Sequence, residues 1–289
     1  MTGGSLGFEL PEELVIDTDA ARRAVGDFIR EQLRQAGFER LVLGLSGGID
    51  SALVAFLAAE AIGSEQLLCV LMPYRTSSDA SRTDAEEVVR RLGCAAELVD
   101  VSGMLDAYFS TPEREDASAL RRGNLAARMR MSVLYDHSVT WRGLVAGTGN
   151  KTEILVGYTT LYGDSACAFA PIGDLYKSQV RQLAVAMGVP EAIVVKDPSA
   201  DLWPGQTDEQ ELGLSYAKLD RLLYWMIDRQ RDPDELTAMG FEPDDVERVR
   251  QQVATSEFKR QMPPVARLVR QDIDDDSLQP GGRAAPTRQ

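Results

Sequence analysis

Residues 41–63 read LVLGLSGGIDSALVAFLAAEAIG, a short apolar run joined to an apolar helix by a glycine-rich loop. The run at 41–45 has the length and composition of a buried strand, and the segment at 50–63 is typical of a helix that ends at Gly63. Glycines in such a loop let backbone N–H groups approach an anion, and the following helix presents the positive end of its dipole. The stretch predicts a phosphate-binding turn between a strand and a helix.

Strand-like and helix-like segments continue to alternate after this loop. Further strands are predicted at 66–73, 96–101 and 143–148, and helices at 79–93, with Asp79 as N-cap and Gly93 as the stop, and at 119–139. The rest is mainly helical, with helices predicted from Lys177 to about Gly188, at 216–228 and at 243–259. This order predicts an α/β fold with a doubly wound, mostly parallel sheet and a helical C-terminal extension. We expect a single domain over residues 1–271 and a disordered tail over 272–289.

Composition and charge exclude several classes of protein. The net charge of −14 over 289 residues argues against a general nucleic-acid binder, which needs a basic field. No apolar run approaches the roughly 18–20 residues that span a bilayer, and the N-terminus lacks the basic start and apolar centre of a signal peptide. We therefore expect a cytoplasmic protein without nucleic-acid or membrane partners. Cys69, Cys94 and Cys167 form no CxxC pair, so no zinc site is expected, and Cys69 lies in a core strand.

The loop at 46–51 differs from the common nucleotide-binding loop of kinases and ATPases. It has no GxxxxGK[ST] pattern, and no lysine follows the glycines. Such a loop suits a pyrophosphate leaving group better than transfer of a γ-phosphoryl group. Asp50 would be an odd choice for anion binding alone, and it makes sense as a ligand of Mg²⁺ that bridges phosphates. The alternative is a glycine-rich turn at an ordinary helix start.

Several segments carry a resemblance to a known family. LSGGIDS (45–51) resembles the pyrophosphate-binding loop of the PP-loop ATP pyrophosphatases. RRGNLAARMRM (121–131), AGTGNKTEILVGY (146–158) and the stretch 171–216 are similar to the ammonia-dependent NAD synthetases within that superfamily. The resemblance covers about residues 22–264. It implies a Rossmann-like fold of the adenine nucleotide alpha hydrolase type, with nucleotide at the carboxyl ends of the strands.

The resemblance also implies a set of binding residues. ATP would be bound by Gly44, Leu45, Ser46, Gly47, Gly48, Ile49, Asp50, Ser51, Thr148, Lys177 and Ser199. Deamido-NAD would contact Asn124, Arg128, Phe258 and Lys259, and Mg²⁺ would be held by Asp50 and Glu153. Asn124 and Arg128 are four residues apart and so share one helical face. Lys177 stands at a helix start, where a cation opposes the dipole and so favours an anionic partner.

The activity implied by the family is ATP- and Mg²⁺-dependent amidation of deamido-NAD to NAD. The nicotinate carboxylate would be adenylated, and ammonia would then displace AMP, as in a carbon–nitrogen ligase that releases AMP and pyrophosphate. Glutamine-dependent relatives carry an N-terminal amidase domain, for which there is no room before Ser46, so ammonia is the expected donor. The family also implies a homodimer. No side chain is assigned as a general base.

Three positions on the substrate side depart from the family pattern: Leu161, Ala168 and Phe258 replace polar residues common in relatives. Two alternatives therefore stay open. One is another PP-loop enzyme, either an adenylating enzyme with a different carboxylate substrate or a tRNA-modifying ATPase. The other is a non-catalytic nucleotide-binding relative, against which the presence of Asp50 and Glu153 argues.

Overall fold

The computed structural model describes residues 8–199 and 207–266, and its centre is a parallel sheet. In these residues the sheet has four strands in the order β3-β2-β1-β4. Their bounds are β1 Arg40–Gly44, β2 Leu67–Leu71, β3 Ala95–Leu98 and β4 Gly143–Ala146. The chain winds outward from β1 to β3 and then returns to place β4 on the other side of β1. The strand order therefore reverses between β1 and β4, which is where open α/β sheets bind ligands.

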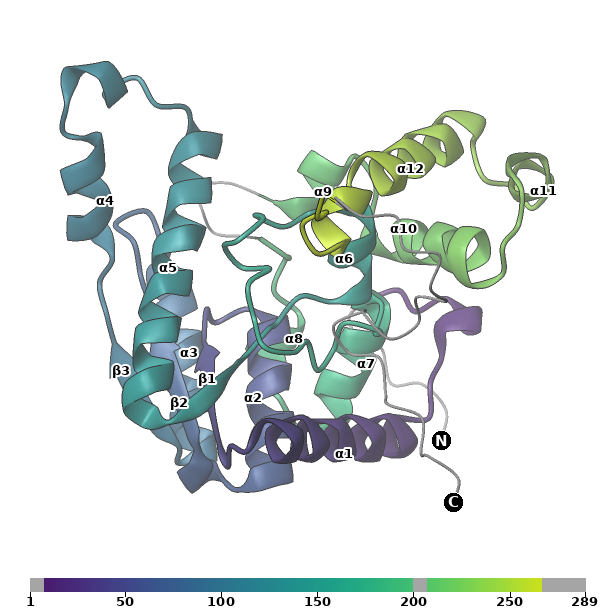
Figure 1. The fold of residues 1–289 in the computed structure, drawn as a ribbon. Coiled ribbons are helices and arrows are strands. Elements are labelled where there is room, and N and C mark those ends of the chain that lie inside the picture. Colours follow the sequence, from purple (N-terminus) through teal and green to yellow (C-terminus); the bar gives the residue numbers. More distant parts are fainter. Residues whose placement is uncertain (1–7, 200–206, 267–289) are drawn as a thin grey trace.

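Helices cover both faces of the sheet (Figure 1). On one face lie α1 (Thr18–Ala36), α2 (Ile49–Ile62), α3 (Asp79–Leu92), α7 (Lys177–Ala186) and α8 (Glu191–Val194), and on the other α4 (Ser102–Phe109) and α5 (Ala119–Trp141). In β1, Leu41 and Leu43 join the core on the α2 face, and Val42 joins the core on the α5 face. Alternate side chains point to opposite faces, so a strand covered on both sides is apolar throughout.

The C-terminal part of the chain forms a helical arm with its own core. It comprises α9 (Asp208–Leu212), α10 (Tyr216–Leu223), a π-helical turn at Tyr224–Asp228, α11 (Pro233–Ala238), α12 (Pro243–Thr255) and a short 3₁₀ turn, Glu257–Arg260. This arm packs on α6 (Lys151–Val156) and on the 3₁₀ turn Glu12–Leu14. Two further 3₁₀ turns, Ser64–Gln66 and Pro112–Arg114, lie in connections. The predicted doubly wound fold with a helical C-terminal extension is confirmed.

Several predicted boundaries were wrong in detail. The third strand ends at Leu98 rather than 101, because Asp100 accepts the Ser102 N–H at 2.7 Å as α4 begins. Ser78, not Asp79, caps α3 by accepting the Ser81 N–H at 3.1 Å. The helix predicted at 216–228 changes to a π-helical turn after Leu223. The helix α1 was not predicted, and the tail at 272–289 lies outside the described residues.

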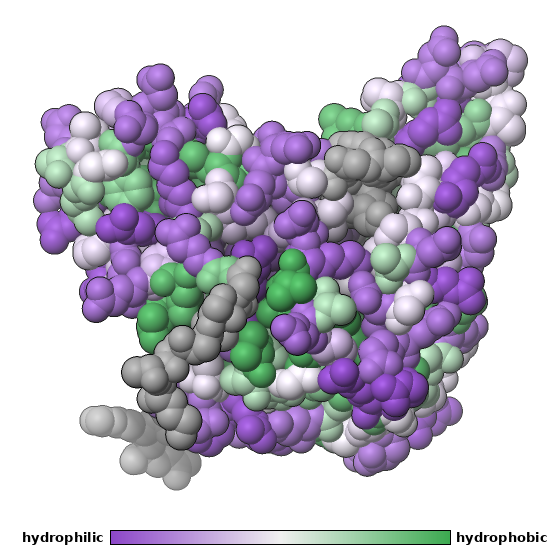
Figure 2. Space-filling model, turned by 180° about the vertical axis from the view of Figure 1, so that it is seen from behind, coloured by the Kyte–Doolittle hydropathy of each residue, from purple (hydrophilic) through white to green (hydrophobic). Residues whose placement is uncertain are grey.

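The molecular surface is hollowed between two raised arms. Figure 1 identifies these arms as α4–α5 and α10–α12, and in Figure 2 the outline dips between them.

Among the described residues, no helix combines the length and apolar character needed to cross a membrane. Cys69 is fully buried as predicted, and the fold brings its thiol to 3.7 Å from that of Cys94.

Candidate active site

A cavity of about 790 Å³ opens at the carboxyl ends of β1 and β4. Its walls include the loop after β1, the residues after β4 and the first turns of α2, α6, α7 and α9. Most residues of the predicted ATP site line it: Gly44, Leu45, Ser46, Gly48, Ile49, Asp50, Ser51, Thr148, Lys177 and Ser199. The switch point of the sheet and the predicted site therefore coincide, and a cavity of this size is typical of small-molecule sites.

The glycine loop leaves the start of α2 open to an anion. Gly48 is the N-cap of α2 and offers no side-chain acceptor to the first N–H groups. The Ser46 and Ser51 hydroxyls lie 3.1 Å apart, and Ser46 Oγ accepts the Gly48 N–H at 3.2 Å. Helix N-terminal N–H groups without a side-chain cap, with hydroxyls beside them, can bind phosphate oxygens.

Gly47 is the one residue of the predicted loop that does not line the cavity, and its role is steric. Its φ is +80°, in the left-handed region, and a Cβ there would lie 2.0 Å from the carbonyl oxygen of Ser81. The first turn of α3 thus presses directly on the loop, and only glycine leaves room for that contact.

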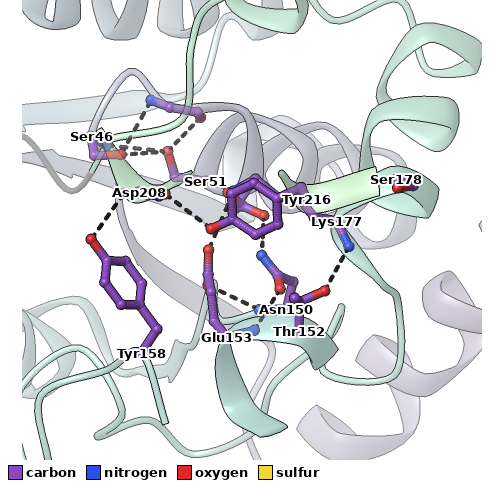
Figure 3. A network of polar contacts seen from close by, with 12 residues as sticks. Ser46, Ser51, Asn150, Thr152, Glu153, Tyr158, Lys177, Ser178, Asp208 and Tyr216 are labelled. Carbon is purple, nitrogen blue, oxygen red and sulfur yellow. Dashed lines mark hydrogen bonds and ion pairs between the residues drawn. The ribbon is translucent and has the colours of Figure 1, made fainter. Parts of the chain in front are cut away.

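Lys177 lies between two carboxylates from distant segments of the chain. Figure 3 shows it beside Asn150 and Thr152, with Glu153 and the ring of Tyr216 nearby. Its Nζ donates to Asp50 Oδ2 at 2.5 Å and to Glu153 Oε1 at 3.3 Å. Only 3% of the Lys177 side chain is exposed, against 17% for each carboxylate. The anionic partner expected for a cation at a helix start is therefore supplied by α2 and α6 of the same chain.

The charges of this cluster do not balance. Burial raises the pKa of Glu153 to about 8, with Asp50 and Asp208 adding to the rise and Lys177 opposing it. Burial alone would lower the pKa of Lys177, but Asp50 and Glu153 outweigh it, so the amine keeps its proton. Three carboxyl groups thus surround one ammonium group, and the raised pKa of Glu153 means that they do not all ionise readily beside a single cation. A second cation at this place would favour their charged forms.

Asn150 was missed by the sequence analysis although its signal was present. It is the N-cap of α6, and its side chain accepts the Glu153 N–H at 3.0 Å while Glu153 Oε2 accepts the Asn150 N–H at 3.3 Å. Its amide also donates to Asp50 Oδ1 at 2.9 Å. The N-x-x-E spacing is the capping-box pattern, so the local helix start was predictable. The contact with Asp50 was not.

Asp208 is a second residue that the sequence did not single out. It is buried at the start of α9, and it accepts hydrogen bonds from the hydroxyls of Tyr216 at 3.0 Å and Tyr158 at 3.1 Å. Tyr158 also donates to Glu211 at 2.8 Å. Burial raises the pKa of Asp208, while Lys177 and the tyrosine hydroxyls oppose that rise. Asp208 therefore lines the cavity from the start of α9, held by two tyrosine hydroxyls.

The residues predicted to contact deamido-NAD lie in different settings. Asn124 and Lys259 line the cavity, whereas Arg128 and Phe258 do not. Arg128 donates from Nε and Nη2 to the Leu161 carbonyl at 3.3 and 3.2 Å, and Lys259 donates to the Gly157 and Thr159 carbonyls at 2.7 and 2.8 Å. The Phe258 side chain is 61% exposed. Their contacts with substrate stay a prediction.

Asp50 and Glu153 have the chemistry of Mg²⁺ ligands. Magnesium is held in proteins by one or two carboxylates, with phosphate oxygens and water completing the shell. Both side chains line the cavity beside the glycine loop, where phosphate would lie. Among the described residues, no group of three or more His, Cys, Asp or Glu side chains is arranged as an all-protein metal site. The pair of carboxyl groups fits a metal that is shared with a phosphate ligand, because a bound divalent cation would favour the ionised form of Glu153.

Comparison with known proteins agrees with this geometry. A family model described as NAD synthase matches residues 21–263. The chain belongs to the NAD synthase family. It is 49% identical over 263 residues to the NH(3)-dependent NAD(+) synthetase of Trichlorobacter lovleyi, covering 91% of this chain and 96% of that protein. The corresponding protein of Chlorobaculum parvum is also 49% identical, over 258 residues, with 89% and 92% covered.

Solved structures of the family share the fold. The NH3-dependent NAD synthetase of Campylobacter jejuni, determined with a nitrate ion, is 34% identical with a TM-score of 0.75, over 88% of this chain and 100% of that one. The NMN synthetase of Francisella tularensis is 28% identical with a TM-score of 0.77, over 87% and 99%. The family and fold expected from the sequence motifs are confirmed.

The close approach of α3 to the glycine loop predicts unequal effects at adjacent glycines. We expect Gly47→Ala to lower the free energy of unfolding by about 1–3 kcal/mol, because the new Cβ strains the backbone and meets Ser81. Gly48→Ala is the matched control: its φ is −90°, its nearest contact is Ser46 Oγ at 3.3 Å, and it should cost within about 1 kcal/mol. Urea unfolding midpoints compare the two, and equal midpoints would show that the contact with α3 is unimportant.

Proposed function

We propose that this protein is an ammonia-dependent NAD synthetase that converts deamido-NAD to NAD with ATP and Mg²⁺. The observation that carries the proposal is the Lys177 ammonium group held by Asp50 and Glu153 beside an uncapped glycine loop. Relatives named NH(3)-dependent NAD(+) synthetase match this chain at 49% identity over nearly their whole length. The identity to these named relatives favours this reaction over other PP-loop adenylating activities.

The site suits activation of a carboxylate by adenylation. A free carboxylate accepts ammonia poorly because its leaving group would be oxide, so its oxygen first attacks the α-phosphate of ATP. Charge then develops on the departing pyrophosphate, beside the N–H groups at the start of α2 and the Ser46 and Ser51 hydroxyls. Lys177 presents a fixed positive charge next to them. When bound by Asp50 and Glu153, Mg²⁺ supplies further neutralisation of phosphate charge.

Direct product analysis tests the reaction. Purified protein with ATP, Mg²⁺, ammonium and deamido-NAD should yield NAD, AMP and pyrophosphate in equal amounts, as read by mass spectrometry. A parallel reaction should contain nicotinate mononucleotide, because the Francisella tularensis protein of the same fold is an NMN synthetase. If only nicotinate mononucleotide were converted, the proposed substrate would change from deamido-NAD to the mononucleotide. No adenylation of either would favour a non-catalytic relative.

Loss of either proposed metal ligand should make the reaction need more Mg²⁺. We expect Asp50→Asn and Glu153→Gln each to lower pyrophosphate release by at least about 100-fold at ordinary Mg²⁺, because each removes one charge from the metal shell. Raising Mg²⁺ should restore part of the rate. Asp84→Asn is the control, since Asp84 holds a different cavity lysine, Lys196, at 2.9 Å. If Mg²⁺ restores nothing, the two carboxylates serve Lys177 rather than a metal.

We also propose that the protein is a homodimer, as the family resemblance implies. Large apolar side chains are exposed on the α4–α5 arm: Met104, Tyr108, Leu120, Tyr135 and Val139. Met104 and Tyr108 are four residues apart on α4, as are Tyr135 and Val139 on α5, so each pair shares one helical face. Exposed apolar side chains grouped in this way are typical of a protein–protein interface. Sedimentation equilibrium should give twice the mass of 31.7 kDa, and Val139→Glu should shift the protein toward the monomer. A wild-type monomer at micromolar concentration would contradict the proposal.

A further inference from the structure

Asp220 lies outside the cavity on α10, and its side chain is fully buried. Its Oδ2 accepts the Ser178 main-chain N–H at 2.7 Å and the Ser178 hydroxyl at 2.6 Å. Its Oδ1 accepts the Thr152 hydroxyl at 2.5 Å, and the Thr152 oxygen accepts the Lys177 main-chain N–H at 3.0 Å. One carboxylate therefore joins α6, α7 and α10.

The start of α7 depends on this carboxylate because the Lys177 and Ser178 N–H groups take their acceptors from outside the helix, whereas Gln179 Oε1 of α7 accepts only the Tyr176 N–H, at 3.0 Å. The N-cap is Tyr176, and its side chain makes no capping hydrogen bond. The first N–H groups of a helix need acceptors, and an anion there is further favoured by the helix dipole. Asp220 satisfies the N–H of Ser178 directly and that of Lys177 through Thr152. A residue on α10 thus caps a helix that begins more than forty positions earlier in the chain.

The two residues that Asp220 holds are the direct neighbours of the charged pair in the cavity. Thr152 precedes Glu153 on α6, and Ser178 follows Lys177 on α7. The Lys177–Glu153 contact of 3.3 Å therefore depends on how these two helix starts are placed against each other. Burying a carboxylate in this way is costly, and burial raises the pKa of Asp220. A neutral side chain would be a cheaper way to fill the same space.

We propose that Asp220 is a positioning residue for adenylation, which sets the place of the Lys177 ammonium group relative to Glu153 through the first turns of α6 and α7. The role rests on the proposed function, because Lys177 and Glu153 act on the phosphates of ATP in that reaction. Asp220 itself touches neither the cavity nor, by this assignment, any substrate.

The decisive variant is Asp220→Asn, which keeps the size of the side chain. Its oxygen can still accept both Ser178 hydrogen bonds, but its NH₂ group is a donor where the Thr152 hydroxyl needs an acceptor, so the hydroxyl proton of Thr152 loses its partner. We expect kcat to fall about 10- to 100-fold, as when groups that orient active-site residues are lost, with the KM values for ATP and deamido-NAD nearly unchanged. The melting temperature should stay level or rise, because a buried charge is removed.

The matched control is Asp245→Asn on α12. Asp245 holds Lys218 of the same helix α10 at 2.6 Å, in an ion pair that includes no residue of α6 or α7. This variant loosens α10 in a general way and should keep the wild-type kcat. An equal loss of kcat in both variants would show that Asp220 only stabilises the fold and does not position Lys177. A wild-type kcat for Asp220→Asn would also reject the positioning role.

Thr152 provides a second, independent pair of variants should Asp220→Asn fail to fold. Thr152→Val removes the relaying hydroxyl and should lower kcat to the same degree, while Thr152→Ser keeps the hydroxyl and should lose far less. The Asp220→Asn/Thr152→Val double variant should lose no more than the larger single loss. If the two losses of kcat were additive in the double variant, Asp220 would not act through the Thr152 hydroxyl.

Hydrogen exchange separates this proposal from the proposed function. In the free protein, Asp220→Asn should speed exchange of the Lys177 and Ser178 amides, because a neutral amide oxygen accepts the Ser178 N–H more weakly than a carboxylate does and Thr152 loses its acceptor. Asp245→Asn should leave both exchange rates unchanged. If the wild-type protein makes no NAD, the proposed function fails, and the exchange result still decides whether Asp220 holds the start of α7. Unchanged exchange in Asp220→Asn, with NAD synthesis intact in the wild type, would reject the positioning role alone.

Discussion

The arrangement of the active site depends on the burial of one positive charge. The Lys177 side chain is 3% exposed, and a buried ammonium group is tolerated only when carboxylates pair with it. Its partners are Asp50, 127 positions away, and Glu153, 24 positions away. Leaving such a charge unpaired costs about 3–5 kcal/mol. The loop after β1, the start of α6 and the start of α7 are therefore held together by electrostatics as well as by the apolar core.

This pairing also fits the proposed binding of ligands of both signs. Helices α2, α6, α7 and α9 all begin at the cavity, so their positive dipole ends face the same space. The first turns of α2, α6 and α9 carry the acidic side chains Asp50, Glu153 and Asp208, which offset the positive potential of the helix starts. A polyphosphate can bind to the N–H groups while a divalent cation binds to the carboxylates. Neither set of groups alone would suit a nucleotide–metal complex, and the switch point of the sheet brings the two together.

Local signals in the sequence predicted the parts of this site but not their contacts. The loop at 46–51 and the helix start at Lys177 were both recognisable, because glycines and dipole-opposed cations have local meanings. Asp208 and Asp220 carry no such signal, since an aspartate in a helical segment is ordinarily solvated and only the tertiary fold buries these two. The helix α1 was missed although Asp17 caps it and Gly37 ends it in the left-handed conformation. Its apolar residues Val25, Ile29 and Leu33 recur at helical spacing, so this helix was predictable from the sequence.

The helical C-terminal arm is best understood as part of the active site rather than as an addition to it. Tyr216 begins α10, places its ring 5.1 Å from the Lys177 ammonium group, and donates its hydroxyl to Asp208. Tyr176 and Tyr216 also belong to the core of the arm, so the packing of that core fixes the wall that surrounds Lys177. At the far side of the arm, the Arg260 guanidinium group donates to the Ile154 and Leu155 carbonyls at the end of α6. The α/β part of the chain supplies the glycine loop and Asp50. The Lys177 ammonium group that pairs with Asp50 is enclosed only when the C-terminal helical arm is in place. Removal of the arm would expose Lys177 to water, and the ion pairs that align three helix starts would then weaken to the level of surface pairs.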